Sequence, residues 1–185
     1  RKLYFNPLMT LEGQKQIKDL CSKYKFKILS LTGDCFMQKP FWKINSAESI
    51  RLQMDFLNII DACNKMGIKF IVLPLVDNGK IDNPQQETIL VNFLKKIYPL
   101  LQSNRMKILF ESNFKPKRYL KFIKKFNHNF FGINYDIGNS ASYGFNPKEE
   151  IDSYGKYIDN VHIKDRVYNG GTVPLGTGNA DFLTV

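Results

Sequence analysis

The amino-acid sequence predicts an α/β fold built around parallel β-strands. Five short apolar runs recur along the 185 residues, and a polar turn and a stretch of helical periodicity separate each run from the next. Two strands joined by one crossover helix run in the same direction, so this order implies a parallel sheet. The runs are almost continuously apolar, which is typical of strands covered on both faces. An open doubly wound sheet and a (β/α)8 barrel both satisfy the pattern.

The five apolar runs are the expected strands. They cover residues 26–31, 68–75, 106–111, 130–136 and 159–164. None of them is followed by the glycine-rich G-x-G-x-x-G turn that dinucleotide sites require, so the sequence gives no support to a nicotinamide or flavin enzyme.

Helices with recognisable ends are expected around these strands. The first covers residues 10–24, ahead of the first strand. Asn45 is the expected N-cap of the next helix, which Gly67 ends. Asn83 and Asn146 each precede a proline, which is typical of an N-cap followed by the first helical residue. The buried face of the helix that ends at Gly67 is expected to carry these residues: Ile50, Met54 and Leu57.

The chain is basic, which raises the question of nucleic acid as a partner. It has 27 Lys and Arg residues against 17 Asp and Glu residues, a formal net charge of +10. In the densest basic stretch, residues 115–126, Tyr119, Phe122 and Phe126 recur at helical spacing. The aromatic residues predict a buried helix face and the lysines a solvated one. We therefore do not expect nucleic-acid binding.

The remaining composition is that of an ordinary globular protein, with 43% hydrophobic and 24% charged residues. The length suits a single domain over residues 1–185. No apolar run approaches the ~18 residues of a membrane span, and the first residues lack the apolar core of a signal peptide. Because Cys21, Cys35 and Cys63 have no metal-binding spacing, a zinc finger is excluded. A reducing cytoplasmic location is expected, with no membrane partner.

Three chemically active side chains stand at the ends of consecutive predicted strands: Glu111, Asp136 and His162. In parallel α/β folds these ends lie on one face, where active sites are built. Two carboxylates and an imidazole suit one divalent ion such as Mn²⁺, Mg²⁺, Co²⁺ or Zn²⁺, with positions left open for substrate. A single such residue is more often a turn or structural residue. Three at matching places indicate a site.

Neighbouring residues suggest how a substrate would be held. Lys164 lies two residues beyond the histidine on the same strand face, so its ammonium would reach a substrate oxygen or phosphate. Asn139, in the turn after the second carboxylate, would donate a hydrogen bond to a hydroxyl. Three aromatic residues after the first predicted strand either line the pocket or pack against helices, and the sequence leaves both open: Phe36, Phe41 and Trp42.

Several segments resemble one known family. In chain order they are "FIVLPLVD", "ILFESNF", "YDIGNSASYGFNPKEEI", "NVHIKDR" and "VPLGTGNADF", and the likeness runs from about Asn6 to Phe182. Together they resemble the xylose isomerase-like TIM-barrel superfamily, in its sugar phosphate isomerase/epimerase branch. Hexulose-6-phosphate isomerase and L-ribulose-5-phosphate 3-epimerase relatives are nearest in character. The D-I-G-N and H-I-K-D pair at this spacing is the most specific part.

The resemblance implies an eight-stranded (β/α)8 barrel with one divalent metal ion. In the family a Glu, an Asp, a His and a second Glu hold the metal, on strands five to eight. By that resemblance Glu111, Asp136 and His162 are metal ligands. Glu111 is also catalytic, because in the epimerase members two glutamates exchange a proton at the carbon beside the carbonyl.

The resemblance also implies substrate contacts and an incomplete barrel. Asn139 takes the place of a substrate-contacting His or Asn, and Lys164 and Arg166 lie near the sugar or phosphate end. Counted on the family barrel, the five predicted strands are the third to the seventh. We therefore expect strands one and two before Arg1, and strand eight with the second glutamate after Val185. Since a full barrel typically needs ~250 residues, the chain is expected to be part of a longer protein or a truncated product.

The sequence thus predicts a divalent-metal-dependent isomerase or epimerase of a small sugar or sugar phosphate, provided that the chain is part of a complete barrel. A proton would move next to a carbonyl through an enediolate. Two alternatives stay open. One is a metal nuclease of the endonuclease IV type, for which two histidines are few. The other is a degenerate or partial barrel that binds a ligand or partner without catalysis. The sugar, the metal and a homo-oligomeric state are left open.

Overall fold

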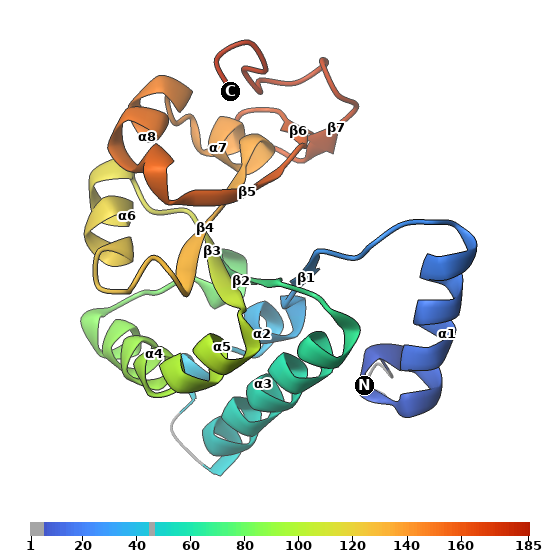
Figure 1. Cartoon of the computed structure of the whole chain (residues 1–185). Helices are drawn as coiled ribbons and strands as arrows, with labels where there is room; N and C mark the ends of the chain where they lie inside the picture. Colours follow the sequence, from blue (N-terminus) through green and yellow to red (C-terminus); the bar gives the residue numbers. More distant parts are fainter. Residues whose placement is uncertain (1–5, 45–46) are drawn as a thin grey trace.

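The five predicted strands form one parallel sheet in the computed structural model, which describes residues 6–44 and 47–185. The strands are β1 (Ser30–Thr32), β2 (Phe70–Leu75), β3 (Lys107–Ser112), β4 (Phe131–Asp136) and β5 (Ile158–His162). They are neighbours in strict chain order, β1-β2-β3-β4-β5. A doubly wound sheet reverses its strand order at a switch point, so that alternative is excluded. The sheet curls into part of a barrel (Figure 1).

The α-helices are α1 (Leu11–Lys23), α2 (Asp34–Gln38), α3 (Ala47–Met66), α4 (Pro84–Lys96), α5 (Tyr98–Asn104), α6 (Pro116–Ile123), α7 (Ile137–Tyr143) and α8 (Pro147–Tyr154). Helices α3 to α6 and α8 lie along the outer side of the curled sheet, whereas α1 precedes β1 and stands apart from the sheet (Figure 1). Single 3-10 turns are η1 (Pro7–Met9), η2 (Phe41–Lys43), η3 (Asp77–Gly79) and η4 (Gly155–Tyr157). After β5, the short strands β6 (Asp165–Arg166) and β7 (Thr172–Val173) pair antiparallel.

The helix ends follow the local chemistry of the sequence. The side chains of Asn83 and Asn146 each accept a hydrogen bond from the backbone N–H three residues on, at 3.0 and 3.1 Å, and a proline begins each helix. Gly67 follows α3 with a φ of 73°, the left-handed conformation that glycine adopts without strain. These three predictions are confirmed. The expected cap at Asn45 lies outside the described residues.

Strand β1 is shorter than predicted and lies later in the chain. The apolar run covers residues 26–31, but pairing with β2 begins only at Ser30. Phe26 and Leu29 remain 48% and 59% exposed. In the part of the chain that the structure describes, β1 pairs only with β2, and residues 26–29 lie outside this strand, with only Ile28 of them partly buried against the core. Apolar character alone did not make this segment a strand.

Only one of the three residues predicted for the buried face of α3 packs against the core, and that residue, Leu57, is partly buried. Ile50 and Met54 are 63% and 60% exposed, whereas Phe56, Ile60 and Cys63 are fully buried. Both sets have helical spacing, so periodicity offered two candidate faces. The ring centroid of Phe56 lies 4.9 to 6.3 Å from those of three other core rings. Aromatic packing against neighbouring elements decided the orientation of the helix.

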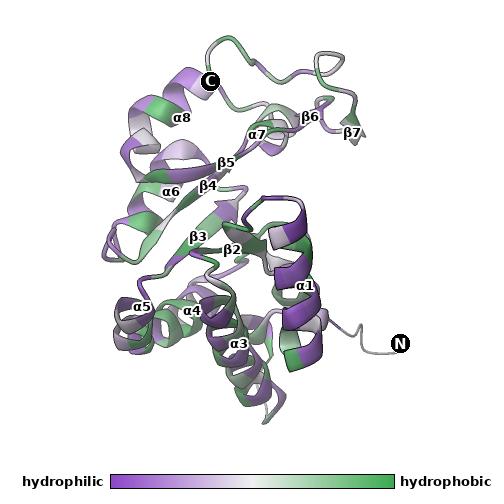
Figure 2. Cartoon of the chain, turned by 45° about the vertical axis from the view of Figure 1, so that its right-hand side comes forward, coloured by the Kyte–Doolittle hydropathy of each residue, from purple (hydrophilic) through white to green (hydrophobic). Residues whose placement is uncertain are grey.

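The aromatic residues after β1 belong to the hydrophobic core. Phe36, Phe41 and Trp42 are at most 1% exposed. Ring centroids of Phe36 and Phe56 lie 4.9 Å apart, and those of Phe41 and Phe93 lie 4.8 Å apart. Of the two alternatives, packing against helices is therefore the correct one. Hydrophobic residues predominate in the central strands, whereas α3 alternates between hydrophobic and hydrophilic residues (Figure 2).

Helix α6 has the solvated basic face that the sequence indicates. Tyr119 and Phe122 in α6 and Phe126 just after it are 3%, 2% and 8% exposed, while the lysines between them are exposed: Lys121, Lys124 and Lys125. The lysines of this stretch thus lie on the solvent-exposed side, opposite the buried aromatic residues. In residues 6–44 and 47–185, no helix combines the length and the apolar character needed to cross a membrane.

Candidate active site

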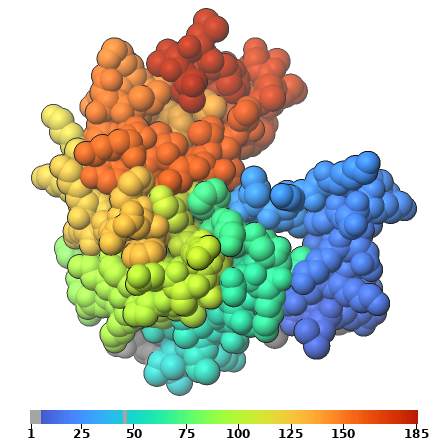
Figure 3. Space-filling model, viewed as in Figure 1, coloured from blue at the N-terminus to red at the C-terminus, as the bar shows by residue number. Residues whose placement is uncertain are grey.

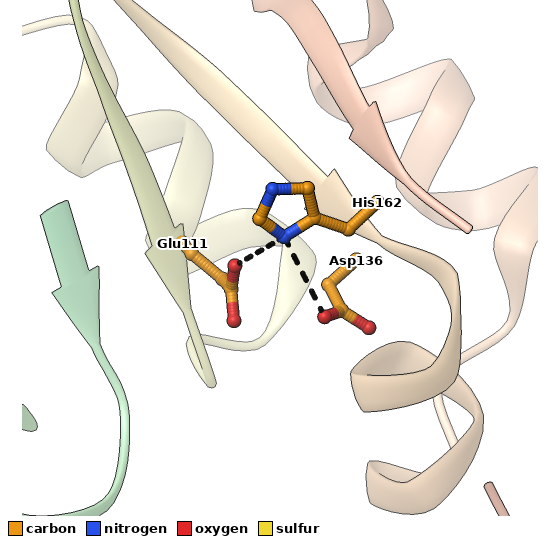
Figure 4. A group of neighbouring side chains, drawn as sticks. All are labelled: Glu111, Asp136 and His162. Carbon is orange, nitrogen blue, oxygen red and sulfur yellow. Dashed lines mark ion pairs between the residues drawn. The ribbon is translucent and has the colours of Figure 1, made fainter. Parts of the chain in front are cut away.

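Three side chains meet at the carboxyl ends of consecutive strands. Glu111 lies near the end of β3, Asp136 ends β4 and His162 ends β5. Asp136 and His162 are register partners in the parallel pairing of β4 and β5, so they lie next to each other. Ligand atoms of all three residues lie within 4.8 Å of one another (Figure 4). The structure thus brings together the group that the strand-end pattern indicates.

The imidazole of His162 lies beside both carboxylates (Figure 4). Its Nδ1 is 3.2 Å from Oε2 of Glu111 and 3.9 Å from Oδ2 of Asp136. The hydrogen bond with Glu111 is the main cause that raises the pKa of His162 above its ordinary value. Desolvation and the ammonium of Lys164 oppose the rise, and the charges of the two carboxylates add to it. The space between the carboxylates therefore favours positive charge.

Asp136 uses its two oxygens differently. Oδ1 accepts the backbone N–H of Asn139 at 2.8 Å and caps α7, while Oδ2 lies 2.7 Å from Nζ of Lys164. Asp136 is 5% exposed and Glu111 8%. A carboxylate after a strand is ordinarily either a helix cap or a site residue. The position of Asp136 allows both roles, because one oxygen caps α7 and the other faces the site.

The three residues predicted to contact substrate line the same cleft but already have protein partners. Lys164 is paired with Asp136. Asn139 donates its amide to Oε1 of Glu111 at 2.7 Å, and its carbonyl oxygen accepts Nη1 of Arg166 at 2.8 Å. The carbonyl of Gly170 accepts two further bonds from the same guanidinium. Contact with a substrate stays a prediction for all three.

Sequence reasoning missed Asn134. Its side-chain nitrogen lies 2.7 Å from Oε2 of Glu111 and 3.0 Å from Nδ1 of His162, and its oxygen accepts the amide of Asn160 at 2.6 Å. Asn134 is 2% exposed. A signal was available, because a polar side chain two residues before Asp136 in an apolar strand must face the same side.

The three-residue group and the three predicted substrate-contact residues line an open cleft of about 270 Å³. Its lining combines the site residues of β3 to β6 with residues in and after the ends of β1 and β2, including Asp34 and Asp77. In the space-filling view the outline is indented between the orange and red C-terminal part and the blue N-terminal part (Figure 3). The cleft is large enough for a small polar molecule beside the three-residue group.

Glu111, Asp136 and His162 fit a divalent metal ion. Two oxygen donors and one nitrogen donor suit Mn²⁺, Mg²⁺, Co²⁺ or Zn²⁺. Ligand atoms that each lie about 2.0–2.2 Å from one ion lie about 3.0–3.5 Å from each other. The 3.2 Å between Oε2 of Glu111 and Nδ1 of His162 falls in this range, and the 3.9 Å between Nδ1 and Oδ2 of Asp136 lies above it. Two buried carboxylates close together also gain from a cation between them.

Comparison with known proteins gives the family. A family model described as xylose isomerase-like TIM barrel matches residues 3–185. The chain belongs to the xylose isomerase-like TIM barrel family. The resemblance drawn from the sequence motifs and the expected partial barrel are thereby confirmed. A comparison with curated protein sequences gave no match.

Solved structures share the fold of this family member at low sequence identity. A xylose isomerase domain protein from Planctomyces limnophilus is 19% identical, with a TM-score of 0.77; the match covers 95% of this chain and 69% of that one. A D-tagatose 3-epimerase-like protein is 20% identical, with a TM-score of 0.74, and the match covers 96% and 71%. The IOLI protein, with a bound zinc atom, is 18% identical, with a TM-score of 0.65, and the match covers 97% and 81%.

Ligands are present in further solved structures of the same fold. A xylose isomerase-like TIM barrel protein from Mycobacterium smegmatis, 16% identical with a TM-score of 0.70, is in complex with magnesium; the match covers 92% of this chain and 64% of that one. A D-allulose 3-epimerase from Methylomonas sp., also 16% identical and with a TM-score of 0.69, is in complex with D-allulose; that match covers 92% and 62%. The chain thus spans less than two thirds of these two proteins.

Proposed function

We propose that this protein is a divalent-metal-dependent isomerase or epimerase of a small sugar or sugar phosphate, when the chain is part of a complete barrel. The observation that carries the proposal is the group of Glu111, Asp136 and His162 at the carboxyl ends of three adjacent strands. Family membership supports it, since sugar epimerases are among the solved structures with this fold.

In the proposed reaction Glu111 moves the proton. Glu111 lines the cleft and is 8% exposed. Its carboxylate would take the proton from the carbon beside the substrate carbonyl and return it to the enediolate, and in D₂O exchange with solvent replaces this proton by a deuteron. Lys164 lines the same cleft and would stabilise negative charge on a substrate oxygen. The second glutamate that the family resemblance implies on an eighth strand is not among residues 6–44 and 47–185.

Glu111, Asp136 and His162 would hold the metal ion. When bound, a divalent ion supplies Lewis-acid chemistry that polarises the carbonyl and stabilises the enediolate. Zinc and magnesium in solved structures of the same fold support a divalent ion in this role. We place the protein in the cytoplasm, consistent with three unpaired cysteines in the described residues.

The test is sugar turnover by the wild type and by Glu111→Gln. With Mn²⁺ and a panel of ketoses and ketose phosphates in D₂O, we expect deuterium at the carbon next to the carbonyl. Glu111→Gln removes the proton acceptor, so turnover should fall by at least the 10²–10⁴-fold that a positioned base contributes. A far-ultraviolet spectrum and melting temperature close to those of the wild type would exclude unfolding.

An unchanged kcat in Glu111→Gln would contradict the assignment. A wild type that binds Mn²⁺ but exchanges no proton on any sugar would favour the alternative, a barrel that binds ligand without catalysis. Of the two histidines of the chain, only His162 lies at the site, and His128 is in the turn before β4. No observation therefore favours a multi-zinc nuclease.

A further inference from the structure

The Glu111 carboxylate is bound by an amide on each of its two oxygens. Oε2 accepts the side-chain N–H of Asn134 at 2.7 Å, and Oε1 accepts that of Asn139, also at 2.7 Å. Both asparagines are buried, at 2% and 7% exposure. A carboxylate with a donor on each oxygen can no longer rotate freely about its last bond, so its plane is set by the two amides.

The side-chain oxygen of each of these asparagines accepts a hydrogen bond from another side chain. The oxygen of Asn134 accepts the amide of Asn160 at 2.6 Å. The oxygen of Asn139 accepts Nη1 of Arg166 at 2.8 Å, and the same guanidinium is anchored on the carbonyl of Gly170. When the oxygen of an asparagine amide accepts a hydrogen bond on one side, its nitrogen is directed to another side. For both Asn134 and Asn139, the nitrogen is directed toward Glu111.

We propose that Asn134 and Asn139 are positioning residues that clamp the Glu111 carboxylate, with Asn160 and Arg166 as their supports. The proposal rests on the proposed function, because it takes Glu111 as metal ligand and proton acceptor. Each amide occupies one lone pair of one oxygen and leaves the others for the ion and for the substrate proton. The clamp orients the carboxylate before the metal ion or the substrate binds. Residues that hydrogen-bond to metal ligands commonly have this role.

This assignment changes the roles that the sequence suggested for Asn139 and Arg166. Both were expected to contact the substrate. In the structure the side-chain oxygen and nitrogen of Asn139 are each used within the clamp, and three hydrogen bonds tie the guanidinium of Arg166 to Asn139 and Gly170. A residue that only contacts sugar and a residue that holds Glu111 can be distinguished by metal binding without sugar.

The experiment measures Mn²⁺ affinity by calorimetry in the absence of sugar. Asn134→Ala and Asn139→Ala should each bind Mn²⁺ 10–100-fold more weakly than the wild type, the cost typical of losing a partner behind a metal ligand. Asn160→Ala and Arg166→Met act through the asparagines and should show smaller losses. The control is Gln14→Ala, which removes another buried amide, bound to the carbonyl of Leu8 at 2.8 Å and remote from the site, and should leave Mn²⁺ affinity unchanged.

Kinetics give a second readout where the wild type turns over a sugar. A misplaced Glu111 lowers kcat with little change in KM, whereas a lost sugar contact raises KM. Asparagine variants that bind Mn²⁺ within about twofold of the wild type, or that only raise KM, would overturn the clamp. Where Asn134→Ala does not fold, Asn160→Ala tests the same arm, because it removes only the support.

The two proposals fail in different ways. If the wild type binds Mn²⁺ and the asparagine variants lose that affinity, but no sugar is turned over, the clamp stands and the proposed function fails. If sugar is turned over and the variants keep both affinity and kcat, the function stands and the clamp fails. A wild type that binds no divalent ion would overturn both.

Discussion

The side chain of Asp136 caps a helix and also faces the proposed metal site. Its Oδ1 accepts the backbone N–H of Asn139 in the first turn of α7, and its Oδ2 faces His162 and Lys164. The cap needs only a hydrogen-bond acceptor, whereas the metal site needs a negative charge. The two tasks can therefore be separated by substitution.

Asp136→Asn should keep the cap and lose the metal site. Asparagine caps helices about as well as aspartate, and alanine does not, so Asp136→Ala should be less stable than Asp136→Asn by about 1 kcal/mol. Both variants should lose Mn²⁺ affinity. Urea denaturation and calorimetry measure the two effects. Equal stability of the two variants would mean that the cap contributes nothing here.

At the scale of elements, the segment after β5 is organised by one buried carboxylate. Asp165 is 1% exposed and accepts the backbone N–H groups of Gly176, Gly178 and Ala180 at 2.9, 2.8 and 3.0 Å. Desolvation acts to raise the pKa of this carboxyl, but the backbone donors outweigh it and hold the pKa below its ordinary value. The loop is thereby tied to β6, the strand that carries Arg166.

Asp165 should make this segment sensitive to acid. Because its pKa is lower in the folded state than in the unfolded chain, its contribution to stability is complete above the unfolded value, about 4. It is lost as the pH falls through the lowered folded value. Asp165→Asn should therefore melt below the wild type at pH 7, and the difference should shrink below about pH 4. A difference independent of pH would contradict this account.

At the scale of the whole molecule, one buried cluster runs from Leu8 to Tyr154 and includes residues of β2, β3 and β4. The site lies at one end of this core, at the carboxyl ends of β3, β4 and β5, where Glu111 and Asp136 are buried carboxylates. Those charges cost stability without a cation between them. Metal binding should therefore be coupled to the stability of the fold.

Mn²⁺ should raise the melting temperature. At a hundred times its dissociation constant a ligand stabilises the folded state by about 2.7 kcal/mol. For a chain of this size that corresponds to a rise of about 5–11 °C. A chelator should reverse the rise, and Glu111→Gln should reduce it. An unchanged melting temperature at saturating Mn²⁺ would argue against the metal site.

Much of the element order could be predicted from local chemistry. Apolar runs predicted β2 to β5 within a few residues, and asparagine before proline predicted the starts of α4 and α8. The strand-end positions of Glu111, Asp136 and His162 predicted that they would meet, because parallel strands end on one edge. Such features depend on a few neighbouring residues or on strand direction, and the sequence contains both.

The remaining features were decided by tertiary structure. Two faces of α3 have helical periodicity, and only the packing of Phe56 shows which one is buried. The aromatic residues after β1 could line a pocket or pack in the core, and only their burial decides between these roles. The partners of Asn134 and Asn139 lie on other elements, so no spacing along the chain indicates them. By itself the sequence determined the order of strands and helices and which polar groups stand at strand ends. Only the tertiary structure decided which side chain each of those groups binds. A hydrogen bond requires two groups to be close in space, and residues far apart in the sequence become close only when the chain folds.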